Sequence, residues 1–91
     1  MSEPASNRPL LFVVEDDIDI ANLIRLHLEQ AGYAIKIFFE ATTVLPEALI
    51  FRPSLFILDI MVPGGGGLDL CRRIRRSPQL ASAAILSLIH I

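Results

Sequence analysis

Residues 56–64, Phe-Ile-Leu-Asp-Ile-Met-Val-Pro-Gly, constrain the fold of this chain more than any other segment. The segment begins with an apolar run of strand-forming residues, which is typical of a strand buried on both faces. Asp59 follows the run, and a Pro/Gly loop comes soon after it. Packing explains an Asp at this position poorly, because Asp is rarely buried without a partner. Ligands and reactive groups of open parallel sheets lie just beyond the carboxyl ends of the strands, so the position indicates function.

Three other segments, residues 9–14, 33–38 and 84–89, also have strand patterns. The first and last are apolar, whereas the second alternates and contains Lys36, which favours a position nearer the sheet edge. Helical patterns lie between the strands at the spacing of βαβ units. The sequence therefore predicts an α/β domain whose parallel sheet is covered on both faces.

The helix boundaries follow from capping residues and helix breakers. Asp17 is the predicted N-cap of the first helix, which ends before Gly32. Thr42 or Thr43 caps the second helix, which ends at an Arg-Pro-Ser turn. The third helix begins at Gly67 or a neighbour and ends at a Ser-Pro pair.

Composition limits the chain to one small domain. The 91 residues are 53% hydrophobic and have a net charge of −2, which gives no general reason to expect nucleic-acid binding. No apolar run approaches the length that spans a bilayer, so we expect no membrane association. We predict a disordered lead-in at residues 1–8 and one domain at residues 9–91. The single cysteine, Cys71, fits a reducing, cytoplasmic setting.

Acidic residues follow two of the predicted buried strands. Glu15, Asp16 and Asp17 come after the first strand, and Asp59 comes after the third. Capping the first helix explains Asp17 but not the other three. Carboxylate oxygens of this kind suit Mg²⁺, and the backbone carbonyl of Met61 can add a ligand. We therefore predict a Mg²⁺ site in which a carboxylate beside the ion can attack phosphorus to form an aspartyl-phosphate.

From about residue 9 to residue 88 the chain resembles the receiver domain of two-component response regulators. The matching motifs are Val-Glu-Asp-Asp at residues 14–17, Leu-Asp-Ile-Met-Val-Pro-Gly at residues 58–64 and Gly-Leu-Asp-Leu-Cys-Arg-Arg-Ile at residues 67–74. The resemblance implies a flavodoxin-like three-layer α/β/α fold with strand order 2-1-3-4. It also implies that a sensor histidine kinase phosphorylates Asp59, with Glu15, Asp16, Asp59 and the Met61 carbonyl holding Mg²⁺.

Such a domain is a signalling phosphoacceptor rather than an enzyme with turnover. The resemblance implies that phosphorylation shifts a conformational equilibrium, which an output surface reads. The implied partners are the kinase, a second copy in a homodimer, and a fused or downstream output domain such as a DNA-binding domain. The implied location is the cytoplasm.

The chain departs from the family pattern at its C-terminal end. The family has Thr or Ser at the end of the fourth strand, where this sequence has Ile89 followed by His90, and Ser87 falls two positions early. The fifth strand with its phosphate-contacting Lys and the last two helices are missing from the 91 residues, so we expect a truncated receiver. We expect such a fragment to associate through its fourth strand.

Two alternatives from other functional classes remain. A receiver that has lost phosphorylation would act as a protein-interaction module, which the missing Thr/Ser and Lys support. An aspartyl-nucleophile phosphatase commonly has a second Asp two residues after the first, whereas this chain has Met61 there. The second alternative is therefore the weaker one.

Overall fold

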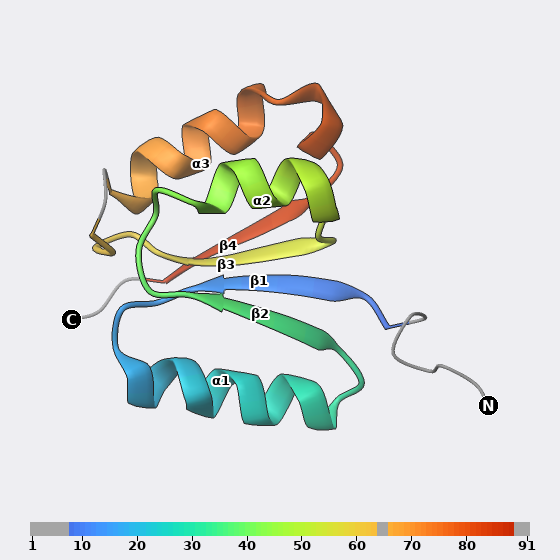
Figure 1. Cartoon of the computed structure of the whole chain (residues 1–91), viewed down its shortest axis with the longest axis vertical. Coiled ribbons are helices and arrows are strands. Elements are labelled where there is room, and N and C mark those ends of the chain that lie inside the picture. Colours follow the sequence, from blue (N-terminus) through green and yellow to red (C-terminus); the bar gives the residue numbers. More distant parts are fainter. Residues whose placement is uncertain (1–7, 64–65, 89–91) are drawn as a thin grey trace.

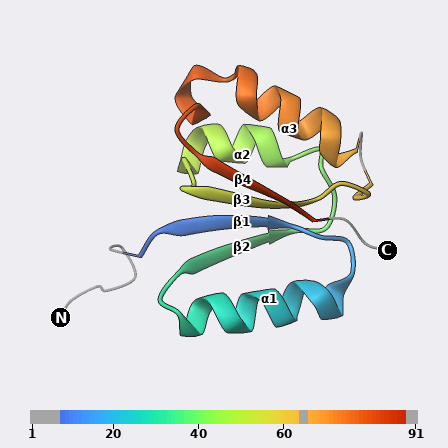
Figure 2. The same cartoon turned by 180° about the vertical axis from the view of Figure 1, so that it is seen from behind.

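In the computed structural model, which describes residues 8–63 and 66–88, a four-stranded parallel sheet lies between two helical layers. The strand order is β2-β1-β3-β4, with α1 on one face and α2 and α3 on the other (Figures 1 and 2). The elements are β1 (Leu10–Val14), α1 (Ile18–Gln30), β2 (Ala34–Phe38), α2 (Val44–Phe51), β3 (Leu55–Asp59), α3 (Gly67–Arg76), the 3₁₀ helix η2 (Pro78–Leu80) and β4 (Ala84–Leu88). This architecture confirms the predicted flavodoxin-like fold and its 2-1-3-4 order.

The two central strands form the core because their side chains are covered on both sheet faces. Toward α2 and α3, the ring of Phe12 packs against Phe38 and Phe56, with ring centroids 4.8 and 5.8 Å apart. On the α1 side, Val13 is fully buried and Ala21 of α1 has no exposed surface. Burial on both faces explains the continuous apolar runs in the sequence.

The boundaries of α1 agree with the capping signals in the sequence. The carboxylate of Asp17 accepts hydrogen bonds from the backbone N–H groups of Asp19 and Ile20, at 2.9 and 3.1 Å. Beyond the last turn, Gly32 has a φ of 101°, a left-handed conformation that favours glycine. Both predictions for this helix are confirmed.

The start of α2 differs from the prediction. Thr43 occupies the N-cap position, but its side chain makes no capping hydrogen bond. The hydroxyl and backbone N–H of Thr42 both donate to the Glu40 carboxylate instead. Those two hydrogen bonds, the hydroxyl bond first, hold the pKa of Glu40 below its ordinary value. The Glu40 carboxylate therefore engages the hydroxyl of Thr42, one of the two capping candidates, and the other candidate occupies the cap position without a capping hydrogen bond.

Other differences lie near the ends of the elements. Asp59 is the last residue of β3 rather than the first after it, and η2 follows α3 where the sequence indicated only a helix stop. Residues 1–7 of the lead-in predicted at residues 1–8, the first two glycines of the run at residues 64–67, and residues 89–91 lie outside the described residues. Among the helices that the structure describes, none has the length and apolar character of a membrane-spanning segment.

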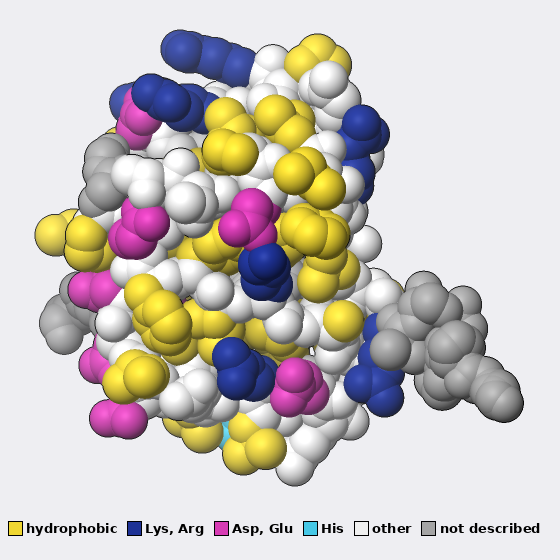
Figure 3. Space-filling model, in the orientation of Figure 1, with side chains coloured by type: hydrophobic (Ala, Val, Ile, Leu, Met, Phe, Trp, Pro, Cys, Tyr) yellow, Lys and Arg dark blue, Asp and Glu magenta, His cyan; other side chains and the backbone are white. Residues whose placement is uncertain are grey.

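The outer strand β2 bears a charged group, as predicted from the sequence. The Lys36 ammonium forms an ion pair with Glu47 of α2 and lies 5.0 Å from the centroid of the Phe51 ring. On the face shown in Figure 3, neighbouring basic and acidic side chains interrupt the hydrophobic surface. A lysine on an edge strand hinders pairing with the strand of another molecule.

Candidate functional site

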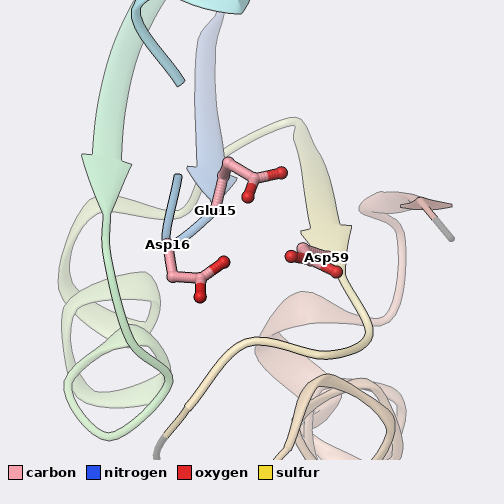
Figure 4. Close-up of side chains that lie close together, drawn as sticks. All are labelled: Glu15, Asp16 and Asp59. Atoms are coloured by element: carbon pink, nitrogen blue, oxygen red, sulfur yellow. The ribbon is translucent and has the colours of Figure 1, made fainter. Parts of the chain in front are cut away.

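The parallel register brings the predicted acidic residues to one edge of the sheet. Val14 aligns with Leu58, so Glu15 and Asp59 lie at neighbouring strand ends. One carboxylate oxygen from each of Glu15, Asp16 and Asp59 lies within 4.8 Å of the other two. Figure 4 shows the three side chains around a shared space. The grouping expected from the sequence is present.

The three carboxylates differ in their exposure to solvent. Glu15 and Asp59 are 0% and 2% exposed, whereas Asp16 is exposed. Burying two carboxylates beside a third one is costly unless a positive charge compensates for the lost hydration. The arrangement therefore favours a cation that approaches from the solvent side, where Asp16 lies.

Backbone hydrogen bonds fix the two buried carboxylates. The Met61 N–H donates to Oδ1 of Asp59 at 3.0 Å, and the Asp17 N–H donates to Oε2 of Glu15 at 3.0 Å. The Glu15 N–H donates to the Phe38 carbonyl at 2.9 Å, which ties the end of β1 to β2. The side chain of Met61 is 72% exposed, so this residue contacts the site through its backbone. The ligand role of its carbonyl stays a prediction.

Gly67 supports the site, a role that the sequence analysis did not assign. A Cβ atom at this position would lie 2.5 Å from the Asp59 carbonyl oxygen and 2.7 Å from Cα of Ile60. The Gly67 N–H donates to the Ile60 carbonyl at 3.0 Å. The first residue of α3 thus packs directly on the backbone that carries Asp59, and only glycine fits there. The sequence has four successive glycines at residues 64–67, and this pattern does not indicate which of them packs against Asp59.

The described part of the fourth strand, Ala84–Leu88, adds no acidic residue, histidine or cysteine to the cluster. Ser87 aligns with Leu58, and Leu88 aligns with Asp59. Position 89, where the family pattern has Thr or Ser, lies outside the described residues. The departures noted at this strand therefore stay predictions.

Comparison with known proteins decides the family. The response regulator receiver domain family matches residues 11–89. The chain belongs to this family. Among its relatives is the transcriptional regulatory protein BaeR of Escherichia coli, 40% identical over 70 residues that make up 77% of this chain and 29% of BaeR. Another is the phosphate regulon transcriptional regulatory protein PhoB of Rhizobium meliloti, 39% identical over 83 residues, 88% of this chain and 35% of PhoB.

Solved structures give the same result for the fold. A putative response regulator from Chloroflexus aurantiacus superposes with a TM-score of 0.85 and 30% identity, over 89% of this chain and 66% of that chain. The receiver domain described here spans about a third of the length of the curated relatives that it matches. It is a signalling domain of two-component systems.

Proposed function

We propose that this receiver domain accepts a phosphoryl group on Asp59 from the phosphohistidine of a sensor histidine kinase. In this proposal Mg²⁺ is held by Glu15, Asp16, Asp59 and the backbone carbonyl of Met61. The observation that carries it is the meeting of three carboxylates, two of them buried, at the carboxyl ends of β1 and β3.

The donor atoms fit a small hard cation. All of them are oxygens, which Mg²⁺ prefers. One carboxylate oxygen from each of Glu15, Asp16 and Asp59 lies within 4.8 Å of the other two, so these three residues would hold the ion together.

The transfer requires Asp59 to act as the nucleophile. One of its carboxylate oxygens forms a bond to phosphorus, and the bond between phosphorus and the kinase imidazole nitrogen breaks. The electron pair of the broken bond stays on the imidazole. Held by these residues, Mg²⁺ would supply positive charge that offsets the negative charge of the phosphoryl oxygens and the carboxylates. The Met61 N–H holds Asp59 in one orientation, which lowers the entropic cost of the attack.

A hydrogen bond connects the loop that follows Asp59 to the loop before α2, so phosphorylation of Asp59 affects both loops. The segment after Asp59 is bonded to the segment before α2 through the Ala41 N–H and the Pro63 carbonyl, 2.9 Å apart. In this proposal the loops around Asp59 have two arrangements, one of which binds the phosphoryl group better. Phosphorylation of Asp59 shifts the population of the domain toward that arrangement. In this proposal an output domain, such as a DNA-binding domain, reads that shift in the cytoplasm, in line with the relatives named transcriptional regulatory proteins.

The test is phosphorylation of the purified chain with acetyl phosphate and Mg²⁺, read as the intact mass. We expect one added phosphoryl group, absent without Mg²⁺ and absent in Asp59→Asn. Asp69→Asn is the matched control, because Asp69 is an exposed acid of α3 outside the cluster. Circular dichroism verifies that each variant is folded. Labelling that survives in Asp59→Asn, or no labelling of the folded parent chain, contradicts the proposal; the second result points to the interaction module without phosphorylation.

A further inference from the structure

Helix α2 is apolar on nearly every side. Its eight residues, Val-Leu-Pro-Glu-Ala-Leu-Ile-Phe, include a single charged side chain, that of Glu47. Val44 and Ala48 pack into the core, and Glu47 forms an ion pair with Lys36 of β2. A helix that is hydrophobic all round is usually buried all round. The fold therefore does not explain why the face of α2 that turns away from the sheet is apolar as well.

The outward side chains of α2 form an exposed apolar surface. Val44 and Ala48 mark the inner face of the helix. At 3.6 residues per turn, Pro46 and Ile50 fall on the outer face. Ile50 is 72% exposed, and Leu49 beside it is 37% exposed. Figure 3 shows hydrophobic side chains gathered over α2. Single exposed apolar residues are ordinary, whereas a contiguous group of them marks an interaction site.

A groove between α2 and α3 continues this surface. The two helices lie side by side over one face of the sheet (Figures 1 and 2). The groove has a volume of 470 Å³. Its lining includes Leu45, Pro46 and Leu49 of α2 and Asp69, Leu70 and Arg73 of α3. Every described residue that lines the groove lies between positions 41 and 73, so β4 takes no part in it.

The α3 wall of the groove has an excess of positive charge. Asp69 is the single acid of α3, and its carboxylate lies 3.0 Å from Nε of Arg73. These two charges offset each other. Arg72 and Arg76 are exposed on the same helix and add two further positive charges beside the groove. The wall therefore favours an occupant that has acidic side chains.

We propose that the groove between α2 and α3 binds an amphipathic helix of a protein partner, whose apolar stripe has acidic residues along one side. The stripe packs against Leu45, Leu49 and Leu70. The acidic residues lie on the α3 side, near Arg73 and Arg76. At 1.5 Å per residue α2 is about 12 Å long, so about two turns of the partner fill the groove with apolar residues at i, i+3 or i+4, and i+7. Neither Asp59 nor Mg²⁺ takes part, so this inference does not depend on the proposed function.

Other occupants fit this surface less well. In a two-fold contact through the groove, the arginines of two α3 helices would come close together, and their like charges would repel. A bilayer surface takes up side chains that protrude, whereas Leu45 and Leu70 line a hollow. Nucleic-acid phosphates gain nothing from apolar walls. An acidic amphipathic helix uses both the apolar walls and the positive charge.

Titration with two synthetic peptides tests the proposal. Both are helical peptides of about 15 residues with the same leucine stripe, and the positions beside the stripe are Glu in one and Lys in the other. We expect the Glu peptide to bind the parent chain at least about tenfold more tightly than the Lys peptide, with a difference that shrinks as salt is added. Fluorescence anisotropy of the labelled peptides measures both affinities. Equal affinities, or no binding of the Glu peptide to the folded parent chain, overturn the proposal.

Variants of the chain locate the binding site. Leu49→Glu puts a negative charge into the groove, and we expect it to weaken binding of the Glu peptide at least about tenfold. Leu26→Glu is the matched control, because Leu26 lies on α1, on the opposite face of the sheet, and is 52% exposed. Arg73→Gln should also weaken binding, whereas Arg25→Gln on α1 should not. Circular dichroism verifies that each variant is folded. Binding that survives Leu49→Glu, or that Leu26→Glu weakens equally, contradicts the proposal.

Two measurements without peptide distinguish the other occupants. Sedimentation of the parent chain and of Leu49→Glu tests for a second copy in the groove. Flotation with vesicles of phosphatidylcholine and phosphatidylglycerol tests for a lipid surface. We expect Leu49→Glu to change neither result. Self-association or vesicle binding that Leu49→Glu abolishes would assign the groove to a second copy or to lipid and would overturn the proposal.

Discussion

The contact between Gly67 and the backbone of Asp59 predicts that Gly67→Ala destabilises the domain. An added Cβ would lie 2.5 Å from the Asp59 carbonyl oxygen, whereas ordinary contacts begin at 3.4 Å. Even the tightest real contacts need the two segments to move apart by about 0.5 Å. Both atoms nearest the added Cβ belong to backbone, so no side-chain rotation relieves the overlap.

The size of the loss follows from two opposing contributions. Overpacking of this kind costs about 1–3 kcal/mol, whereas alanine is about 1 kcal/mol better than glycine inside a helix. Gly67 is the first residue of α3, where the helical gain is smaller, and its N–H bond to Ile60 restrains the movement. We expect a net loss of about 1–2 kcal/mol in the free energy of unfolding. A domain of 91 residues has only about 5–14 kcal/mol in total.

Urea denaturation followed by circular dichroism measures this loss, and titration with Mg²⁺ gives the second readout. Because the overlap displaces the backbone of Asp59, we also expect weaker Mg²⁺ binding. Gly32→Ala is the control: Gly32 has a φ of 101° with nothing within 4 Å of the added Cβ. It should lose about 1 kcal/mol through backbone strain and keep the parent's Mg²⁺ affinity. The reasoning is refuted if Gly67→Ala unfolds at the same urea concentration as the parent or at a higher one.

Three further predictions follow from the site and its surroundings. Mg²⁺ at about ten times its dissociation constant should raise the free energy of unfolding by about 1.4 kcal/mol. We expect a smaller gain in Asp16→Asn and the same gain in the control Asp69→Asn. Thermal melts with and without the ion measure this difference. Asp17→Ala should lose about 0.5–2 kcal/mol in urea denaturation, because two backbone N–H groups of α1 lose their acceptor. The lowered pKa of Glu40 stabilises the folded state above the ordinary value of 4.5, and the contribution disappears as the pH falls through the folded value. Thr42→Val, which lacks the hydroxyl bond to Glu40, should therefore be less stable than the parent at neutral pH and differ less from it in acid.

Much of the fold could be predicted from the sequence because its signals are local and agree with one another. The apolar runs of β1 and β3 need two covered faces, Asp17 supplies a helix cap, and Lys36 marks an edge strand. Parallel pairing then places the carboxyl ends of neighbouring strands side by side, whatever the conformation of the connecting loops. That is why Glu15 and Asp59, far apart in the sequence, were expected to meet.

The features that were not predicted depend on contacts between segments or on local competition. The Thr42 hydroxyl could either cap α2 or donate a hydrogen bond to Glu40. The sequence does not show that the Glu40 carboxylate lies within hydrogen-bond distance of this hydroxyl. Gly67 is one glycine of a run, and its contact with Asp59 appears only when α3 is placed on β3. Neither choice follows from residue pattern alone, because each depends on distances set by the packed fold.

The three successive acids after β1 show how the cap of α1 and the carboxylate cluster are joined. Oε2 of Glu15 accepts the N–H of Asp17, while the carboxylate of Asp17 accepts the first N–H groups of α1. The backbone bond to Glu15 uses the Asp17 N–H and not its side chain, so Asp17→Ala leaves it in place. The cap can therefore be removed without removing a carboxylate of the cluster. If Asp17→Ala lowers stability but keeps Mg²⁺ affinity, Asp17 belongs to the helix and Glu15 and Asp16 to the site; a parallel loss of affinity would show that the helix start positions the carboxylates.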